Sequence, residues 1–498
     1  MKLYRIDKND TVAVAVEPIE AGETLGSGEF EVTALEPIKK GHKIALKDIA
    51  KGEMIIKYGS PIGEAACDIP KGGWIHTHNL LSHADDDKDY VYDFHEDRVV
   101  MPGTIESDLT FRGYRRPGGE TGVRNYIAVM SGVFCANAHI KQITEKANQM
   151  FPKTENFDGF IALTHECGCG QEGEDLEAVR LAQAGLMMNP NFGGILFVQV
   201  GCEITRLENL KEYGILREDR IRMFTMQEET DEFETGIRLA GELYDIVKED
   251  RRENRPISEL HLGFNCGGSD GFSGLTANKL VGELAEYLTA RGATVSITEI
   301  TEMFGAEQML MNKAVDEETF HKVRALLDGH KEYIRKYGGT ANGNPSFGNK
   351  EGGLSTIEDK TLGCVQKGGR CAIVDALMYG QRAVRHGFHL VQGPGSDLVG
   401  VTSQIISGAV MEIFTTGRGT PVAFACPTLK VATNNAIFDQ KRGWMDFNAG
   451  VLLDGKPMEE LLEEFMDLVM KAVNGDYRTS NEKMGFYEIG FQRDGVIL

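Results

Sequence analysis

The alternation of short apolar runs with amphipathic helical patterns, from about residue 122 onward, constrains the fold of this chain more than any other feature. Runs typical of strands lie at 126–130, 160–164, 195–200, 221–225, 260–265, 294–299, 389–392 and 411–415. Helical patterns lie between them, for example at 176–187, 232–249, 275–289 and 319–336. This order predicts an α/β region with mostly parallel sheets, built from strand–helix–strand units.

The first 80 residues follow a different pattern, in which short strands are separated by turns that contain glycine. Candidate strands lie at 11–16, 43–46 and 54–57, with Lys40-Gly41 and Lys51-Gly52 among the turns between them. This pattern predicts a small all-β module over residues 1–80. An acidic linker over 81–114 follows. The charged segment 248–256 contains no strand-like run and predicts a boundary between a middle α/β domain at 115–250 and a C-terminal α/β domain at 256–498.

The charge balance limits the partners that this chain can have. Its 53 basic and 75 acidic residues give a net charge of −22, which argues against general binding to nucleic acid or to an anionic membrane. The N-terminal segment contains charged residues within its first few positions and no long apolar run, so no export or membrane segment is expected. The nine cysteines are scattered and odd in number, which disfavours a disulfide framework. We therefore expect a cytoplasmic protein with reduced thiols and neither a nucleic-acid nor a membrane partner.

Three cysteines follow predicted strands and stand next to glycine: Cys169, Cys202 and Cys266. Cys364 has a similar setting. Because parallel strands end at one edge of a sheet, we expect that edge to gather the first three. Two interpretations stay open: a shared metal or redox-sensitive site, or small side chains that pack in the core. Four other cysteines are expected to pack in the core, and Cys167 is ambiguous; the four are Cys67, Cys135, Cys371 and Cys426.

A second candidate metal site is the segment Trp74-Ile75-His76-Thr77-His78-Asn79. In a strand, positions two apart point to the same face, so His76 and His78 could reach one ion from one side. Imidazole suits iron, manganese or zinc. The alternative is a pair of ordinary surface histidines.

Two glycine-rich segments, 344–350 and 415–421, combine backbone amides and hydroxyl groups with a cation each, Lys350 and Arg418. Such loops suit a carboxylate, which arginine can bind through two parallel hydrogen bonds. Ordinary tight turns are the alternative. Neither segment has the spacing of a nucleotide-binding loop. After the predicted strand at 294–299 the chain also carries Glu299 and Glu302.

Several longer motifs resemble those of a known family, the altronate/galactarate dehydratases. In the first module GHKIAL at 41–46, KYGSPIG at 57–63 and IHTHN at 75–79 resemble the family's β-clip (SAF) domain. Further motifs are similar to its catalytic region: GCE at 201–203, CGGSDGFSGLTAN at 266–278, EMFGAEQ at 302–308, NPSFGNKEGG at 344–353, EDKTLGC at 358–364, TTGRGTP at 415–421 and DFNAG at 446–450. The resemblance covers essentially the whole chain and is closest to the altronate branch. The segment HECGCGQEGEDL at 165–176 departs from that branch.

The resemblance implies a metal-dependent hydro-lyase, with a C-terminal catalytic domain, that removes water from a sugar acid and gives a 2-keto-3-deoxy sugar acid. D-altronate is the favoured substrate. The alternatives are galactarate, another aldonate, a sulfonated hydroxy acid, or a non-catalytic protein that binds sugar acids. The implied cofactor is Fe²⁺ or Mn²⁺, and an iron–sulfur cluster is a further option. We also expect a homo-oligomer, with a dimer favoured.

The residues expected to act in this chemistry fall into three groups. Candidates for proton transfer are His165, His42 and Lys43. Candidates for substrate binding are Arg418, Lys350, Asn349, Ser269, Asp270 and Thr416. Candidates for metal binding are His76, His78, Cys169, Cys202, Cys266 and Cys364.

Overall fold

The computed structural model describes residues 2–26, 30–86, 88–214 and 217–494. Asp87, in the predicted linker, and residues 495–498, at the end of the predicted C-terminal domain, lie outside this description.

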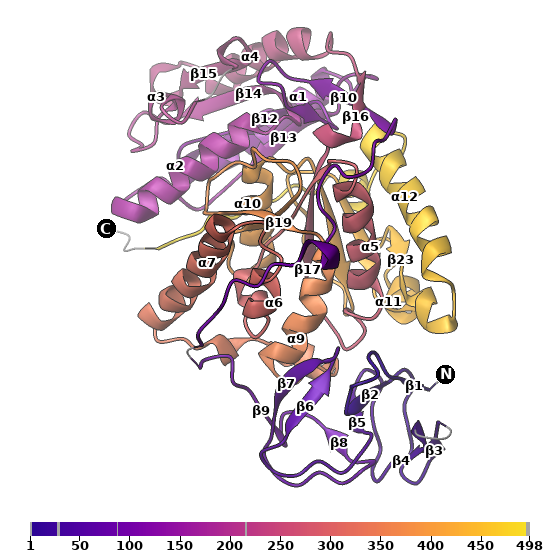
Figure 1. The fold of residues 1–498 in the computed structure, drawn as a ribbon. Helices are drawn as coiled ribbons and strands as arrows, with labels where there is room; N and C mark the ends of the chain where they lie inside the picture. Colours follow the sequence, from indigo (N-terminus) through magenta and orange to yellow (C-terminus); the bar gives the residue numbers. More distant parts are fainter. Residues whose placement is uncertain (1, 27–29, 87, 215–216, 495–498) are drawn as a thin grey trace.

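An all-β module begins the chain and lies at the bottom of Figure 1. Its strands pair antiparallel in three small sheets. These sheets contain β1 (Leu3–Tyr4), β2 (Val12–Ala15), β5 (Lys43–Ala45) and β8 (Trp74–Ile75); β3 (Thr24–Leu25) and β4 (Val32–Thr33); and β6 (Met54–Lys57), β7 (Ser60–Ala65) and β9 (Leu80–Leu81). Gly41 and Gly52 both have a φ of 84° in the predicted Lys-Gly turns, a conformation that glycine adopts without the steric cost of a Cβ atom.

The largest sheet has seven parallel strands in the order β19-β20-β18-β17-β21-β22-β23. Its strands are β17 (His261–Cys266), β18 (Thr294–Ile297), β19 (Ile373–Leu377), β20 (Phe388–Val391), β21 (Met411–Thr416), β22 (Thr428–Ala432) and β23 (Phe447–Asn448). The first of them in sequence, β17, has β18 on one side and β21 on the other. Where the chain leaves neighbouring strands in opposite directions, a crevice opens at their carboxyl ends, and ligands of open α/β sheets bind there.

A second parallel sheet, at the top of Figure 1, forms the middle domain. Its strands are β12 (Tyr126–Met130), β13 (Gly159–Leu163), β14 (Phe192–Gln199) and β15 (Ile221–Thr225), in the order β13-β12-β14-β15. Here too the first strand, β12, lies between two strands that follow it, so this sheet has its own crevice.

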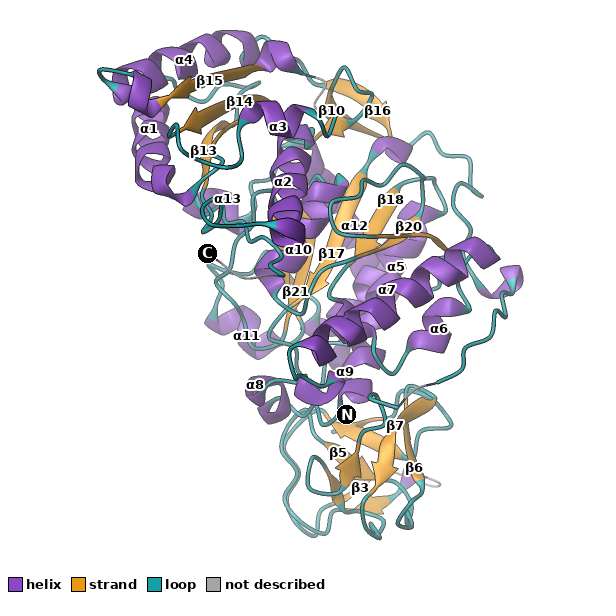
Figure 2. Cartoon of the chain, turned by 90° about the vertical axis from the view of Figure 1, so that its left-hand side faces the viewer, coloured by secondary structure: helices purple, strands orange, loops and turns teal. Residues whose placement is uncertain are grey.

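Helices cover both sheets, and Figure 2 shows the two sheets and the β module as three tiers. The helices are α1 (Asn137–Met150), α2 (Gly173–Met188), α3 (Leu207–Lys211), α4 (Glu232–Val247), α5 (Ala277–Thr289), α6 (Glu307–Met311), α7 (Glu317–Lys336), α8 (Phe347–Glu351), α9 (Ile357–Cys364), α10 (Asp397–Ser407), α11 (Asn435–Gln440), α12 (Met458–Asn474) and α13 (Ser480–Met484). In α5, Leu280, Leu284 and Leu288 recur every four residues and are all fully buried, the spacing that gives a helix one apolar face. In Figure 1, α5 and α12 lie on one side of the seven-stranded sheet and α7 lies on the other.

The two α/β domains share part of their core. Phe197 of the middle sheet and Leu186 of α2 belong to the same buried cluster as Val401 and Ile405 of α10. A Cβ atom on Gly185 would lie 2.4 Å from the Cγ2 atom of Ile406, so α2 and α10 approach too closely there for a larger residue. We therefore expect these domains to hold their relative orientation through direct packing.

The predicted acidic linker lies along the C-terminal domain. Val91 pairs through its backbone with the Gln308 side chain, and Val100 forms a parallel bridge with Cys371. The chain then enters a three-stranded antiparallel sheet of β10 (Thr110–Arg115), β11 (Thr121–Gly122) and β16 (Glu253–Pro256). The prediction that 248–256 contains no strand is wrong, because β16 pairs with β10. Its polar, largely exposed side chains leave no apolar run to mark it.

The predicted fold class, an SAF-like β module followed by two α/β parts with parallel sheets, is confirmed. The predicted strands at 126–130 and 221–225 coincide with β12 and β15, whereas β19 and β22 were not predicted. Among the described residues, no helix combines the length and the apolar character needed to cross a bilayer.

Candidate functional site

A cavity of about 720 Å³ opens at the crevice beside β17. Its walls come from the carboxyl ends of β17 and β18, the loop at 340–349, α9 and the start of α10. The chemically active side chains among its described lining residues are Cys266, Glu299, Glu302, Lys360 and Asp397. The cavity therefore stands where the topology predicts a ligand site.

Two thiols, a carboxylate and two ammonium groups meet at the end of β17. The Sγ atom of Cys266 lies 3.5 Å from Cys364 Sγ and 3.3 Å from Glu302 Oε2. Lys367 Nζ lies 2.7 Å from Cys266 Sγ, and Lys360 Nζ lies 2.7 Å from Glu302 Oε1. Lys360, Cys364 and Lys367 are four and three residues apart along α9 and the turn η9 (Val365–Gly368), the spacing that places side chains on one helical face.

This cluster shifts the pKa of each of its members. The hydrogen bond with Cys364 is the main cause that lowers the pKa of the Cys266 thiol, and the same contact raises that of Cys364 well above its usual value. Burial alone would raise the pKa of Glu302, but Lys360 and Lys367 outweigh it and lower the value to about 2. The site therefore contains an ionised carboxylate, and its two ammonium groups favour the anionic form of the Cys266 sulfur.

Two further carboxyl groups, Glu299 and Asp397, line the same cavity. Glu299 has a φ of 63°, a left-handed conformation that costs a non-glycine residue about 1–3 kcal/mol and is common at functional sites. One of its carboxyl oxygens, Oε2, is buried without a hydrogen-bond partner. Burial, then the nearby Glu302, raises the pKa of Glu299 well above its usual range and that of Asp397 to about 6.

The donor set at β17 fits a thiophilic divalent ion. The ligand atoms of Cys266, Glu302 and Cys364 all lie within 4.8 Å of one another, the single such trio in the part of the chain that the structure describes. Thiolate ligands favour iron or zinc over manganese, which prefers oxygen. Lys360 and Lys367 would balance the excess negative charge of three anionic ligands. Metal binding by Cys266 and Cys364 stays a prediction.

The β module docks beside this site through a buried ion triad. The carboxylate of Asp359, on α9, lies 2.7 Å from both Lys43 Nζ and Lys57 Nζ, and all three side chains are at most 1% exposed. Lys43 also donates hydrogen bonds of 2.8 Å to the carbonyl oxygen of Gly353 and to Ser355 Oγ. Lys43 was expected to transfer a proton, a role that stays a prediction. In the structure its contacts join the module to the C-terminal domain.

Two of the three candidate histidines of the β module, His42 and His76, lie at the same contact, whereas His78 is exposed and lies beside Trp74 of its own module. His42 Nε2 lies 3.3 Å from the carbonyl oxygen of Glu351, and His76 Nδ1 lies 3.0 Å from Ser355 Oγ. The expectation that His76 and His78 share a strand face is wrong, because β8 ends at Ile75 and a turn follows. His42 is instead the ring next to His76, with centroids 4.9 Å apart. Metal binding by His76 and His78, and proton transfer by His42, stay predictions.

The candidate substrate-binding loops also converge here. Asn349 lines the cavity, donates to the carbonyl oxygen of Ser269 and accepts from Lys360. Ser269 Oγ is buried without a partner, whereas Asp270 accepts hydrogen bonds from Thr433 and Asn434.

Thr416, at the end of β21, accepts a hydrogen bond from the amide of Gly419. The two predicted cations, Arg418 and Lys350, lie outside the described lining of the cavity. Arg418 is 44% exposed in its side chain and paired with Glu351 at 3.0 Å. Lys350 lies on α8 and is absent from the described lining of the cavity. Binding of a substrate carboxylate by Arg418 or Lys350 stays a prediction.

His165, Cys169 and Cys202 belong to the middle domain. The expectation that one sheet gathers Cys169, Cys202 and Cys266 is wrong, because the first two follow β13 and β14 whereas Cys266 ends β17 of the other sheet. His165 is buried, with Nε2 2.8 Å from the carbonyl oxygen of Ser131 and Nδ1 3.1 Å from the amide of Cys167. These contacts order the loop after β13.

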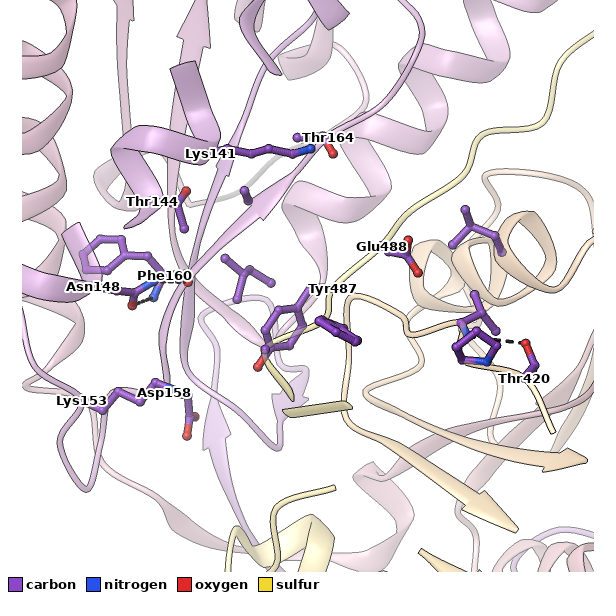
Figure 3. Close-up of a pocket in the computed structure, with 17 residues that line it drawn as sticks. Lys141, Thr144, Asn148, Lys153, Asp158, Phe160, Thr164, Thr420, Tyr487 and Glu488 are labelled. Atoms are coloured by element: carbon purple, nitrogen blue, oxygen red, sulfur yellow. Dashed lines mark hydrogen bonds between the residues drawn. The ribbon is translucent and has the colours of Figure 1, made fainter. Parts of the chain in front are cut away.

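A larger cavity of about 1150 Å³ lies between β13 of the middle domain and residues 420–422 and 485–488 of the C-terminal domain. Figure 3 shows Lys141 and Thr164 on one side of it and Thr420 and Glu488 on the other. The lining contains no cysteine or histidine among the described residues, and it lacks the paired acids of the cavity at β17. We therefore place the chemistry at β17.

Five residues of the site were given no role from the sequence: Glu299, Glu302, Lys360, Lys367 and Asp397. The two glutamates after β18 were noticed, and the spacing Lys360-x₃-Cys364-x₂-Lys367 could have indicated a functional helix face. Asp397 has no comparable signal, since an acidic residue in the first turn of a helix is ordinary.

Comparison with known proteins matches the whole chain to one family. Residues 1–83 match the altronate/galactarate dehydratase SAF domain, residues 113–248 match the second domain of D-galactarate dehydratase/altronate hydrolase, and residues 257–497 match the C-terminal domain of D-galactarate/altronate dehydratase.

Similar curated proteins agree with this match. The chain is 39% identical to the altronate dehydratase of Escherichia coli (strain K12), over 100% of both chains. It is 40% identical to the altronate dehydratase of Bacillus subtilis (strain 168), over 99% of both. It is 31% identical to the galactarate dehydratase (L-threo-forming) of E. coli, over 97% of this chain and 95% of that protein.

Proposed function

The chain belongs to the altronate/galactarate dehydratase family, and we propose that it removes water from an aldonate, with D-altronate as the preferred substrate. As a member of this family it is a hydro-lyase that dehydrates a sugar acid. The proposed reaction takes the proton from C2 and the hydroxyl group from C3. The resulting enol then becomes a 2-keto-3-deoxy acid.

The charge of the cavity at β17 is the observation that supports an aldonate. Lys360, which is itself paired with Glu302 at 2.7 Å, is the single lysine or arginine among the described lining residues, and Arg418 lies outside this lining. An aldonate carries one carboxylate, whereas galactarate carries two and would leave one of them without a cation. The remaining polar lining, which includes Thr301, Asn344 and Ser346, suits the hydroxyl groups of a sugar chain.

The two carboxyl groups of the cavity supply an acid and a base. Because Glu299 and Asp397 interact, they titrate as a pair, and the group with the higher pKa keeps the proton. In this proposal Glu299, whose pKa is raised well above its usual range, is the acid, and Asp397 is the base. We propose that Asp397 accepts the C2 proton, that Glu299 protonates the departing hydroxyl, and that Lys360 faces the substrate carboxylate on which negative charge develops.

We also propose that Cys266, Glu302 and Cys364 hold Fe²⁺. When bound, the ion would act as a Lewis acid toward a substrate oxygen. Lys367, 2.7 Å from Cys266 Sγ, favours the anionic form of that sulfur.

The substrate is tested by a panel of acids, with the purified chain kept anaerobic and supplied with Fe²⁺ or Mn²⁺. The panel contains D-altronate, two other aldonates, galactarate and sulfolactate, and the product measured is the 2-keto-3-deoxy acid or, for sulfolactate, released sulfite. We expect the highest kcat/KM with D-altronate, higher activity with Fe²⁺, and no product from Glu299→Gln. A higher kcat/KM with galactarate or sulfolactate would overturn the substrate assignment. Full activity of Glu299→Gln would overturn the role of the pair.

A further inference from the structure

Three cysteines of the middle domain lie in the loops that follow three neighbouring strands. Met130 of β12 is in register with Leu163 of β13 and Phe197 of β14. Cys135 comes five residues after Met130, Cys169 six after Leu163 and Cys202 five after Phe197. All three cysteines are exposed and unpaired by disulfides. The expectation that Cys135 packs in the core is therefore wrong.

The loops that carry these cysteines touch one another through their backbones. The amide of Phe134 donates to the carbonyl oxygen of Cys167 at 2.9 Å. A Cβ atom on Gly168 would lie 2.0 Å from the carbonyl oxygen of Gly132, and one on Gly132 would lie 1.9 Å from that of Thr205. Each cysteine is within three residues of one of these contacts, so the loops that carry the three thiols converge beyond the carboxyl ends of β12, β13 and β14, where ligands of open α/β sheets bind.

The same loops contain polar atoms without partners. Glu203 Oε1, Thr205 Oγ1 and Asn137 Oδ1 are buried and form no hydrogen bond. Their residues lie one to three positions from Cys202 or Cys135. Buried polar atoms are rarely left unpaired in a folded protein, so a group bound at these loops would supply partners that the described side chains do not.

We propose that Cys135, Cys169 and Cys202 bind a [4Fe–4S] cluster, at a site separate from Cys266. Each cysteine of such a cluster binds a different iron, so its ligand sulfurs lie farther apart than those of one ion. The three sulfurs here are not all within 4.8 Å of one another, so they do not form a site for a single ion. Three thiolates leave one iron with a position for water or an oxygen ligand. The N-termini of α1 and α2, which follow Cys135 and Cys169, favour the net negative charge of the cluster with its thiolates.

The test is the iron and acid-labile sulfide content of the full chain, purified anaerobically from cells supplied with iron. We expect about four irons and four sulfides per chain in the wild type, in addition to any ion at Cys266. Cys135→Ser, Cys169→Ser and Cys202→Ser should each lose more than half of the sulfide. Cys266→Ser should keep it, and Cys67→Ser, which replaces another exposed cysteine, is the matched control.

Circular dichroism and thermal unfolding identify variants that do not fold, and Cys135→Ala gives a second replacement at the central strand. Iron without sulfide in the wild type would overturn the cluster. Unchanged sulfide in folded Cys135→Ser or Cys135→Ala would overturn the ligand assignment, and loss in Cys266→Ser alone would move the cluster to β17. Because none of these measurements uses turnover, failure of the cluster is distinguishable from failure of the proposed dehydration.

Discussion

Replacement of Asp359 by asparagine tests how the β module is held against the catalytic domain. Asp359 is fully buried and is shared by Lys43 and Lys57, each 2.7 Å away. It also accepts the amide hydrogen of Ser355 at 3.0 Å. Asp359→Asn keeps the size of the side chain and removes its charge, which leaves two buried ammonium groups without their counter-ion.

The expected cost is large because removing one partner of a buried ion pair typically destabilises a protein by about 3–5 kcal/mol. At about 1.36 kcal/mol for each factor of ten, the population in which the module is undocked should rise by two to four orders of magnitude. The exposed pair Arg324–Asp328, with both side chains more than 40% exposed, supplies the matched control. Asp328→Asn should change the free energy of unfolding by no more than about 1 kcal/mol.

The chain has two tryptophans, of which Trp74 lies in the β module and Trp444 in the C-terminal domain. In a Trp444→Phe background, fluorescence during urea unfolding therefore reports on the module alone, while circular dichroism reports on the whole chain. We expect Asp359→Asn to shift the Trp74 transition to lower urea than the transition of the whole chain. Coincident transitions together with a loss below about 1 kcal/mol would refute the reasoning, because the triad would then contribute no more than a surface pair.

Three further outcomes are expected. Burial raises the pKa of the Asp359 carboxyl, but Lys43 and Lys57 outweigh burial and lower this pKa below its usual range. The stability that ionised Asp359 contributes is therefore complete above the unfolded pKa of about 3.9 and is lost as the pH falls toward the folded pKa. The urea midpoint should fall more steeply with acid in the wild type than in Asp359→Asn. Lys360→Gln should lower kcat/KM by about ten- to a hundred-fold in steady-state assays. If Arg418→Lys showed a loss of this size and Lys360→Gln showed none, the substrate carboxylate would instead bind outside the cavity, at Arg418. Asp397→Asn should lower kcat by about 10²- to 10⁴-fold with little change in thermal stability, and retention of wild-type kcat would remove Asp397 from proton transfer.

β12 was located from the sequence because all five of its residues are apolar or aromatic. β15 was located although it contains Arg222, because Ile221, Met223 and Phe224 are large apolar residues. β22 was missed because its apolar residues are smaller and surround Lys430, which is fully buried although lysine is usually exposed. Lys430 donates to the carbonyl oxygen of Thr420, a partner ten residues away that only the folded chain brings close.

The site was predictable in part. Cys266 was singled out by its place after a strand, and its thiol does lie beside that of Cys364. Its grouping with Cys169 and Cys202 failed because a strand–helix alternation does not show which strands share a sheet. Lys360 and Lys367 were passed over because a lysine on a helix is normally solvated, and only the docking of α9 over the end of β17 buries them.

The position of α9 links the ion triad to the chemistry. Successive side chains of a helix point about 100° apart. Asp359 and Lys360 are adjacent in sequence and therefore contact different parts of the protein. Asp359 meets the two lysines of the β module, while Lys360 meets Glu302 at 2.7 Å in the cavity. Anchoring the first turn of this eight-residue helix therefore also fixes the ammonium group of Lys360 and, one turn later, the thiol of Cys364. A β module that supplies no side chain to the described lining of the cavity can in this way determine where the catalytic groups stand.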